Sequence, residues 1–299
     1  MKNFFYASLL LVSLIFTFGY GVGVGKYNWF PHDLIKQVKF LASSSASLEF
    51  DALGRLVHSS GHTEVNCPEQ NERVGVLVAF GQSNSANYAE YKFSSDELNG
   101  VFNYFNGSCY LAQSPLLGAQ GGDGEWITLT SKKLIEEGVY DKVIVVSSGM
   151  GGTSIARWSD ENDLHNMLMD VLENLSNDYR VTDMIWHQGE SDRIYTHTEV
   201  YETYFMSMID SIRDAGINAP IFMSVASICG EEGSWAYPNR VSNAQTRLVD
   251  VDGVELGVNT DELVPIQLRY DNCHFAKAGQ EVAASELAQR IVKFHATEQ

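Results

Sequence analysis

The stretch that decides the fold is VLVAFGQSNSANYAE, Val76–Glu90. It opens with an uninterrupted apolar run and changes abruptly at Gly81 to the polar sequence QSN. A short apolar run without alternation predicts a strand that is buried on both faces of a sheet. Ser83, directly behind this strand, is either the N-cap of a following helix or a nucleophile at the end of a strand.

Four further apolar runs predict the same kind of strand, and amphipathic segments lie between them. The five strands are expected at residues 74–80, 142–148, 182–188, 220–227 and 253–258. Helical periodicity marks residues 126–137, 164–175, 200–212, 241–249 and 278–294. Strands that alternate with helices predict parallel βαβ units in a three-layer α/β/α sandwich. Ligands bind such sheets at the carboxyl ends of the strands, so the chemistry is expected there.

The composition limits the partners that the protein can have. The chain has 299 residues, 44 % of them apolar, which is sufficient for a folded core. Its formal net charge is −18, and a surface this acidic repels the phosphate backbone of nucleic acids. The expected substrates are therefore neutral or weakly charged, and no nucleic-acid partner is expected.

The N-terminal segment, residues 1–25, predicts export. No charged residue occurs between Lys2 and Lys26, and this run is about as long as the roughly 20 residues that span a bilayer. We expect a membrane anchor, with a cleaved signal peptide as the alternative. In both cases the remaining chain faces the periplasm or the cell exterior, or is secreted. Residues 26–72 are serine-rich and polar and predict a stalk, which leaves 73–299 as the folded domain.

The cysteines agree with export. The four of them, an even number, predict two disulfides in an oxidising compartment, and three pairings are open. Cys67 and Cys109 flank the first strand, whereas Cys229 and Cys273 both fall at the expected catalytic edge. The pairs Cys67–Cys109 and Cys229–Cys273 are therefore favoured, with four buried thiols as the alternative. None of the spacings is that of a zinc site.

Unusual sequences follow two more strands and precede the last helix. They are SSGMGGTS (147–154), WHQGESD (186–192) and YDNCHF (270–275). A serine hydroxyl becomes a nucleophile when a base takes its proton, and His274 is a candidate base for Ser83. Asp271 stands three residues earlier, where one turn can hold its carboxylate against the imidazole. Backbone N–H groups of Ser83 and Gly152 and the amide of Gln188 are candidate donors to an oxyanion.

The four blocks GQSN, GGTSIARW, HQGESD and DNCH, in this order, resemble the SGNH hydrolase superfamily. More narrowly they resemble the sialate O-acetylesterase-like carbohydrate esterases, which include acetylxylan esterases. The resemblance covers about residues 74–294. It implies a flavodoxin-like sandwich with about five parallel strands. It also implies removal of acetyl groups from sugar hydroxyls without a metal or another cofactor.

Carried over residue by residue, the resemblance makes Ser83 the nucleophile and gives Asp271 and His274 the other places of the triad. Gly152 matches the oxyanion glycine. The superfamily pattern Gly-x-Asn-Asp is replaced here by GESD, residues 189–192, so its asparagine donor is absent. The resemblance implies that Gln188 takes that place, with the neighbouring Ser191 as the alternative.

Several nearby residues have open roles. Glu190 is expected to brace the active-site loops, or else to compete with Asp271 as the carboxylate that orients a histidine. Asn84 and Trp158 are candidates for lining the substrate site, and core packing is the alternative for Trp158. A metal site formed by residues 187, 190 and 192 is not expected, because their spacing matches no H-E-x-x-H type of motif.

These observations predict an exported serine esterase that removes O-acetyl groups from a glycan or a small acetylated sugar, by way of an acetyl-enzyme. An exported acetyltransferase would pass the acetyl group to a second sugar. A glycan-binding protein that retains an esterase fold is the third possibility. The residues do not identify the sugar; sialic acid, xylan and other polysaccharides stay open.

Overall fold

A computed structural model describes residues 47–231 and 236–297. Its centre is an eight-stranded sheet with the order β10-β9-β8-β4-β7-β5-β6-β3. All neighbours from β10 to β5 are parallel, whereas β6 and β3 continue the sheet in antiparallel pairing. The strands are β3 (Glu64–Val65), β4 (Val74–Gly81), β5 (Val101–Phe105), β6 (Ser108–Leu111), β7 (Lys142–Ser147), β8 (Asp183–His187), β9 (Ile221–Val225) and β10 (Val254–Asn259).

Strand β4 lies in the middle of the sheet, and all eight of its residues are buried. Because side chains alternate along a strand, β4 supplies both cores of the protein. Val76, Val78 and Phe80 belong to one buried cluster, whereas Leu77 and Ala79 belong to the other. This two-sided burial is the reason why the strand is continuously apolar.

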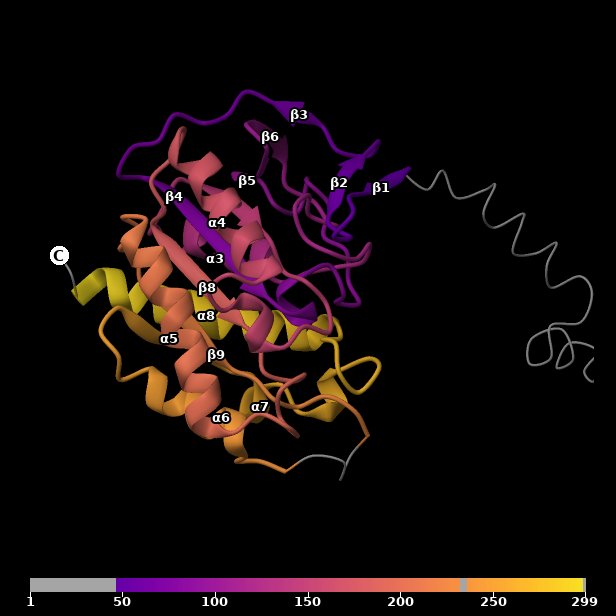
Figure 1. Ribbon diagram of the computed structural model, residues 1–299. Coiled ribbons are helices and arrows are strands. Elements are labelled where there is room, and N and C mark those ends of the chain that lie inside the picture. The colour runs from indigo at the N-terminus through magenta and orange to yellow at the C-terminus, as the bar shows by residue number, and fades with distance from the viewer. Residues whose placement is uncertain (1–46, 232–235, 298–299) are drawn as a thin grey trace, which may run out of the picture. The chain divides into compact units, whose positions relative to one another are not determined.

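Helices cover both faces of the sheet (Figure 1). One face packs against α4 (Asp163–Ser176), α5 (Thr198–Asp214) and α6 (Arg240–Leu248). The other packs against α3 (Ile127–Glu136) and α8 (Lys277–Thr297).

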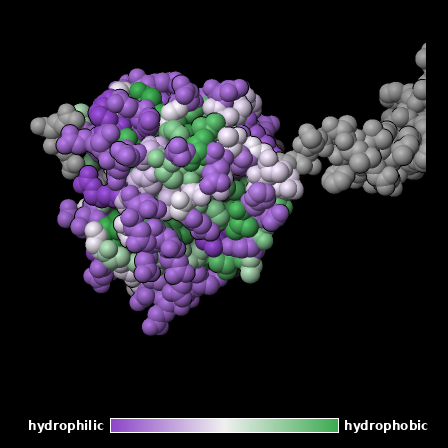
Figure 2. All heavy atoms as spheres, turned by 90° about the horizontal axis from the view of Figure 1, so that it is seen from above, coloured by the Kyte–Doolittle hydropathy of each residue, from purple (hydrophilic) through white to green (hydrophobic). Residues whose placement is uncertain are grey.

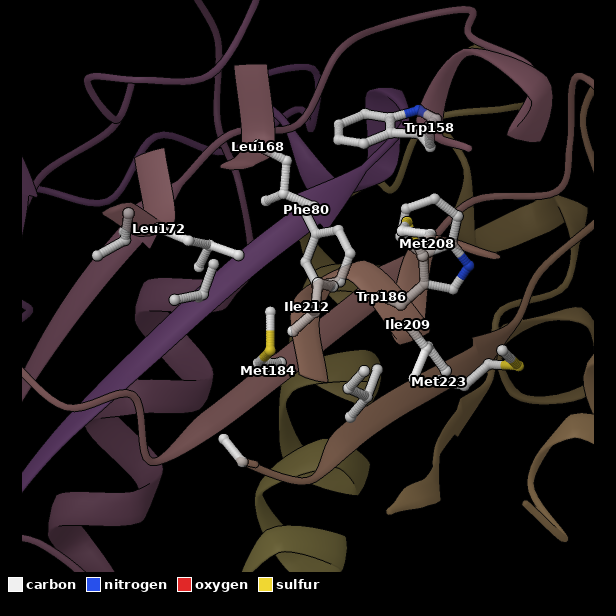
Figure 3. Packing of buried hydrophobic residues seen from close by; sticks show 14 of the residues in the cluster. Phe80, Trp158, Leu168, Leu172, Met184, Trp186, Met208, Ile209, Ile212 and Met223 are labelled. Carbon is white, nitrogen blue, oxygen red and sulfur yellow. The ribbon is translucent and has the colours of Figure 1, made fainter. Parts of the chain in front are cut away.

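Aromatic rings fill the first of these cores (Figure 3). The ring of Phe80 lies 5.0 Å from that of Trp186 and 6.2 Å from that of Trp158, measured between ring centroids. Leu168 and Leu172 of α4 and residues of α5 close this layer around them.

The predicted fold class, a three-layer sandwich with about five parallel strands, is confirmed. The five predicted strands correspond to β4, β7, β8, β9 and β10, and their order in the sheet is the flavodoxin-like 2-1-3-4-5. Strand β5 adds a sixth parallel strand, which was not expected from the sequence. Its apolar residues are interrupted by Asn103 and it is only five residues long, so it lacks the continuous pattern.

The folded unit starts earlier than expected. It begins at Leu48, so the boundary predicted at residue 73 lies too late in the chain. The hairpin of β1 (Leu48–Phe50) and β2 (Leu56–Ser59) and the short strand β3 occupy part of the predicted stalk, and β3 pairs with β6. The polar turn formers of this region connect short strands rather than form a linker. The predicted anchor or signal peptide at 1–25, and the stalk as far as residue 46, lie outside the described residues.

Both favoured disulfides are present, Cys67–Cys109 and Cys229–Cys273. Two disulfides favour an oxidising environment and hence export. In residues 47–231 and 236–297 no helix combines the length and the apolar character needed to cross a bilayer. The face seen in Figure 2 is mostly hydrophilic, and hydrophobic residues gather there in smaller patches.

Candidate active site

Ser83 begins the 3-10 helix η1 (Ser83–Ser85), two residues beyond the end of β4. The N-cap position belongs to Gln82, so Ser83 is not the cap of this helix. Gly81 has a φ of +126°, and a Cβ there would lie 2.1 Å from the carbonyl oxygen of His187. Glycine is therefore required for the turn that carries Ser83 past the end of β8. Ser83 is 5 % exposed, and its backbone N–H has no acceptor among the described residues.

His274 and Asp271 form a hydrogen-bonded pair on the turn before α8. Nδ1 of His274 lies 2.7 Å from Oδ2 of Asp271. The other carboxylate oxygen, Oδ1, accepts the backbone N–H groups of His274 (2.7 Å) and Cys273 (3.0 Å). Burial by itself raises the pKa of Asp271, but these hydrogen bonds outweigh it and hold the pKa below its ordinary value. An ionised Asp271 directs Nδ1–H toward itself and leaves Nε2 as the basic nitrogen.

Three contacts fix the His274 turn, and one of them joins it to η1. Asn84 Nδ2 donates to the carbonyl oxygen of Cys273 at 3.3 Å, and the buried guanidinium of Arg269 donates to the same oxygen at 2.7 Å. The disulfide Cys229–Cys273 ties the turn to the segment after β9. Ser83 and His274 each neighbour a partner in the Asn84–Cys273 contact, so both lie at the same edge of the sheet. Their side chains share no direct hydrogen bond, which is common in a free enzyme.

A glycine loop follows β7 at the same edge. The N–H of Met150 donates to the carbonyl oxygen of Gly81 at 2.8 Å, which fixes the loop against the end of β4. Gly152 has a φ of +67°, is exposed, and a Cβ there would meet nothing within 4 Å. Within the described part of the chain its N–H has no acceptor. Ser83 and Gly152 thus present two unpaired backbone donors, as an oxyanion site requires.

Gln188 is placed differently from the expectation. Its side chain is fully buried, and its amide nitrogen donates to the carbonyl oxygen of Thr153 at 3.0 Å and to Oδ2 of Asp192. Both amide protons are used in these two bonds, so none is left for an oxyanion in this structure. Gln188 instead supports the glycine loop through its hydrogen bond to Thr153. Ser191, the alternative, is exposed, and its backbone N–H donates to Oε1 of Gln82 at 3.1 Å.

Glu190 pairs with a different histidine from the one beside Ser83. Its Oε1 lies 3.0 Å from Nε2 of His187 and accepts from Nδ2 of Asn84 at 2.9 Å. Burial by itself raises the pKa of Glu190, but the His187 ring and the Asn84 amide outweigh it and lower the pKa to about 2. Asn84 is 2 % exposed and connects Glu190 to the His274 turn, so it braces the site and does not line it.

Trp158 is also not a lining residue. It is fully buried in the aromatic core of Figure 3, where its indole nitrogen donates to Thr153 Oγ1 at 3.1 Å. Asp192 is bound by the N–H of Ile155 and by the hydroxyl of Thr196. In the ranges that the structure describes, no group of three metal-ligating side chains comes together.

Comparison with known proteins identifies the family. The model of the family described as carbohydrate esterase, sialic acid-specific acetylesterase, matches residues 124–293, more than half of the chain. The chain belongs to this family. It is thus a carboxylic ester hydrolase of the carbohydrate acetylesterase type, and the resemblance stated from the sequence is confirmed. The match contains Gly152, Asp271 and His274 and begins after Ser83.

Solved structures agree with this fold. A protein from Arabidopsis thaliana superposes with a TM-score of 0.57 at 16 % identity, over 75 % of this chain and 99 % of its own. NanS superposes with a TM-score of 0.55 at 16 % identity, over 76 % of this chain and 98 % of its own. A search of curated proteins finds no match.

Two residues of the candidate site, Tyr88 and Gln120, were not expected from the sequence. The ring of Tyr88 stacks on His274 with 5.4 Å between centroids and 21° between planes. Gln120 accepts hydrogen bonds from Tyr88 and from the glycine loop. For Tyr88 the sequence offers one hint, which is its position five residues after Ser83. For Gln120 it offers none, because this residue lies in a loop without a recognisable motif.

Proposed function

We propose that the protein is a serine esterase that removes O-acetyl groups from carbohydrate by way of an acetyl-enzyme. The observation that carries this proposal is the Asp271–His274 pair, with 2.7 Å between Nδ1 and Oδ2, beside the strand end that bears Ser83. Membership of the carbohydrate esterase family supports the substrate class. The two disulfides support an exported enzyme that meets its substrate outside the cytoplasm.

Acylation begins when Ser83 Oγ attacks the acetyl carbonyl carbon and passes its proton to Nε2 of His274. Asp271 stabilises the imidazolium that results. The carbonyl oxygen becomes an oxyanion between the N–H groups of Ser83 and Gly152. When the intermediate collapses, the bond from the carbonyl carbon to the sugar oxygen breaks. His274 returns its proton to that oxygen, and the sugar leaves as an alcohol.

Deacylation repeats these steps with water. His274 takes a proton from the water molecule as its oxygen attacks the acetyl-enzyme, and the same two N–H groups hold the second oxyanion. Collapse breaks the bond from the carbonyl carbon to Ser83 Oγ, which recovers a proton from His274. Acetate is released and the enzyme returns to its starting state.

The charges near the site favour a neutral or weakly charged sugar. The phenol of Tyr270 is 46 % exposed beside His274, with 6.2 Å between the ring centroids. Burial and then the negative charges of Asp271, Asp123 and Glu90 raise the pKa of this phenol. Asp123 is also paired with Lys92 at 3.3 Å, so it is the charge of Asp271 and Glu90 near Tyr270 that disfavours an anionic substrate.

The test is the hydrolysis of an aryl acetate by the Ser83→Ala variant. We expect kcat to fall by at least about 10⁴-fold while the fold is kept, because the nucleophile is lost. Ser176→Ala is the matched control; it removes an exposed hydroxyl from the last residue of α4 and should keep kcat within about twofold. Turnover by folded Ser83→Ala at the rate of the control would exclude the mechanism.

A further inference from the structure

One side-chain oxygen of Gln120 contacts both the glycine loop after β7 and Tyr88, whose ring stacks on His274. Gln120 lies in the loop between β6 and α3 and is half-buried. Its Oε1 accepts the N–H of Gly151 at 2.8 Å and the hydroxyl of Tyr88 at 3.0 Å. Its backbone N–H donates to the carbonyl oxygen of Gly149 at 2.9 Å. The glycine loop is thus bound to Gln120 on both sides of Met150.

These contacts act on both parts of the proposed chemistry. Binding the N–H of Gly151 fixes the peptide next to Gly152, whose N–H is a candidate oxyanion donor. Binding the hydroxyl of Tyr88 fixes the ring that stacks on His274. The fit is close, since a Cβ on Gly151 would lie 2.9 Å from both Gln120 Oε1 and the Tyr88 hydroxyl.

The β1–β2 hairpin contacts the loop of Gln120 through Leu56 and the Gln120 side chain through Gly54. Leu56 of β2 exchanges two backbone hydrogen bonds of 2.8 Å with the Gln120 loop, to the carbonyl oxygen of Ala119 and from the N–H of Gly118. Gly54 has a φ of +87°, and a Cβ there would lie 2.8 Å from Nε2 of Gln120. A side chain at this turn would therefore displace the Gln120 amide from its present position.

We propose that Gln120 is a positioning residue of the esterase, which sets Gly152 and His274 relative to each other, and that the β1–β2 hairpin keeps Gln120 in place. This inference rests on the proposed function. It makes the segment from Leu48 to Ser59 a working part of the enzyme, although it lies outside the range matched by the family model.

The first test replaces Gln120 by methionine, which keeps the length of the side chain and removes the acceptor. We expect kcat/KM for an aryl acetate to fall about 10- to 100-fold, almost entirely in kcat, because oxyanion donors act in the transition state. Gln113→Met is the matched control; this side chain lies in the same loop and donates to the carbonyl oxygen of Gly61 instead. Equal kcat/KM in the two folded variants would overturn the inference.

A second pair of variants leaves Gln120 itself unchanged. In Gly54→Ala the new methyl group pushes against the Gln120 amide, and we expect kcat/KM to fall at least about fivefold. Gly107→Ala is the control, because its φ of +82° imposes similar backbone strain while a Cβ there meets nothing within 4 Å. If both alanine variants keep the parent's kcat/KM, the hairpin does not position the site. This pair also decides the matter if Gln120→Met does not fold.

Hydrogen exchange separates this inference from the proposed function. Amide exchange of the peptide that covers residues 147–154 should become at least about tenfold faster in Gln120→Met and stay unchanged in Gln113→Met, whether or not the parent hydrolyses the ester. Absence of hydrolysis by the parent counts against the proposed function. Unchanged exchange in Gln120→Met counts against the positioning role.

Discussion

Two carboxylates lie near the candidate site, and exchanging each for its amide should produce opposite effects. Asp271 contacts His274 on the turn before α8, whereas Glu190 contacts the buried His187 at the end of β8. Asp271→Asn removes the negative charge and replaces one carboxylate oxygen by an NH2 donor, so the side chain no longer fixes the His274 tautomer. We expect kcat for an aryl acetate to fall about 10⁴-fold, which corresponds to about 5.5 kcal/mol of transition-state stabilisation. The side chain of Asp271 is 39 % exposed, so its pair adds less than about 1 kcal/mol to the free energy of unfolding.

Glu190→Gln should instead lower the stability of the protein and leave kcat nearly unchanged. The pKa of Glu190 is lowered from its ordinary value of 4.5 to about 2, a difference of about 2.5 pH units. At about 1.4 kcal/mol per pH unit this makes the ionised side chain worth about 3 kcal/mol to the folded state at neutral pH. Its side chain is 1 % exposed, so solvent does not screen the interaction. We therefore expect the free energy of unfolding to fall by about 3 kcal/mol, with kcat within about tenfold of the parent.

Urea unfolding and steady-state kinetics on both variants measure the two effects in parallel. Both assays are run at a temperature at which each variant is folded, so that loss of kcat is not loss of folded enzyme. The reasoning is refuted if Glu190→Gln loses kcat about 10⁴-fold while Asp271→Asn stays near the parent. That pattern would make Glu190 the carboxylate on which the catalytic histidine depends.

Two further predictions concern stability. The disulfides close segments of 42 and 44 residues, so replacing either pair by serines should lower the free energy of unfolding by about the same amount, roughly 4 kcal/mol. Only loss of Cys229–Cys273 should also lower kcat, because it releases the turn of His274; an equally large loss of kcat in the Cys67–Cys109 variant would contradict this. Because the pKa of Glu190 is lowered on folding, its contribution is complete above about pH 4.5 and is lost as the pH falls toward 2. Acid titration of the unfolding free energy should show a drop about 3 kcal/mol larger in the parent than in Glu190→Gln, and parallel curves would contradict the assignment.

The layers of the fold could be predicted because their signals are local. A strand buried on both faces, such as β4, must be apolar throughout, and the helices that cover it must repeat apolar residues at helical spacing. Strand β5 and the hairpin of β1 and β2 were missed because they are short and only partly buried. Short elements of this kind are determined by their neighbours in the fold more than by their own sequence.

The site could be predicted in its residue types more reliably than in its hydrogen bonds. Asp271 and His274 are three residues apart, so one turn suffices to join them. The amide of Gln188 bonds to Thr153, 35 residues away, and that of Asn84 to Cys273, 189 residues away. An amide can donate in many directions, and its partners are chosen by packing that only the folded chain defines.

The central claim is that Ser83 is a nucleophile activated by His274. A fluorophosphonate, which reacts covalently with activated serines, tests it without knowledge of the sugar. We expect mass spectrometry to find one phosphonyl group per chain, on the peptide that contains Ser83, and almost no labelling in the His274→Ala variant. Labelling of another serine, or equal labelling rates with and without His274, would contradict the account.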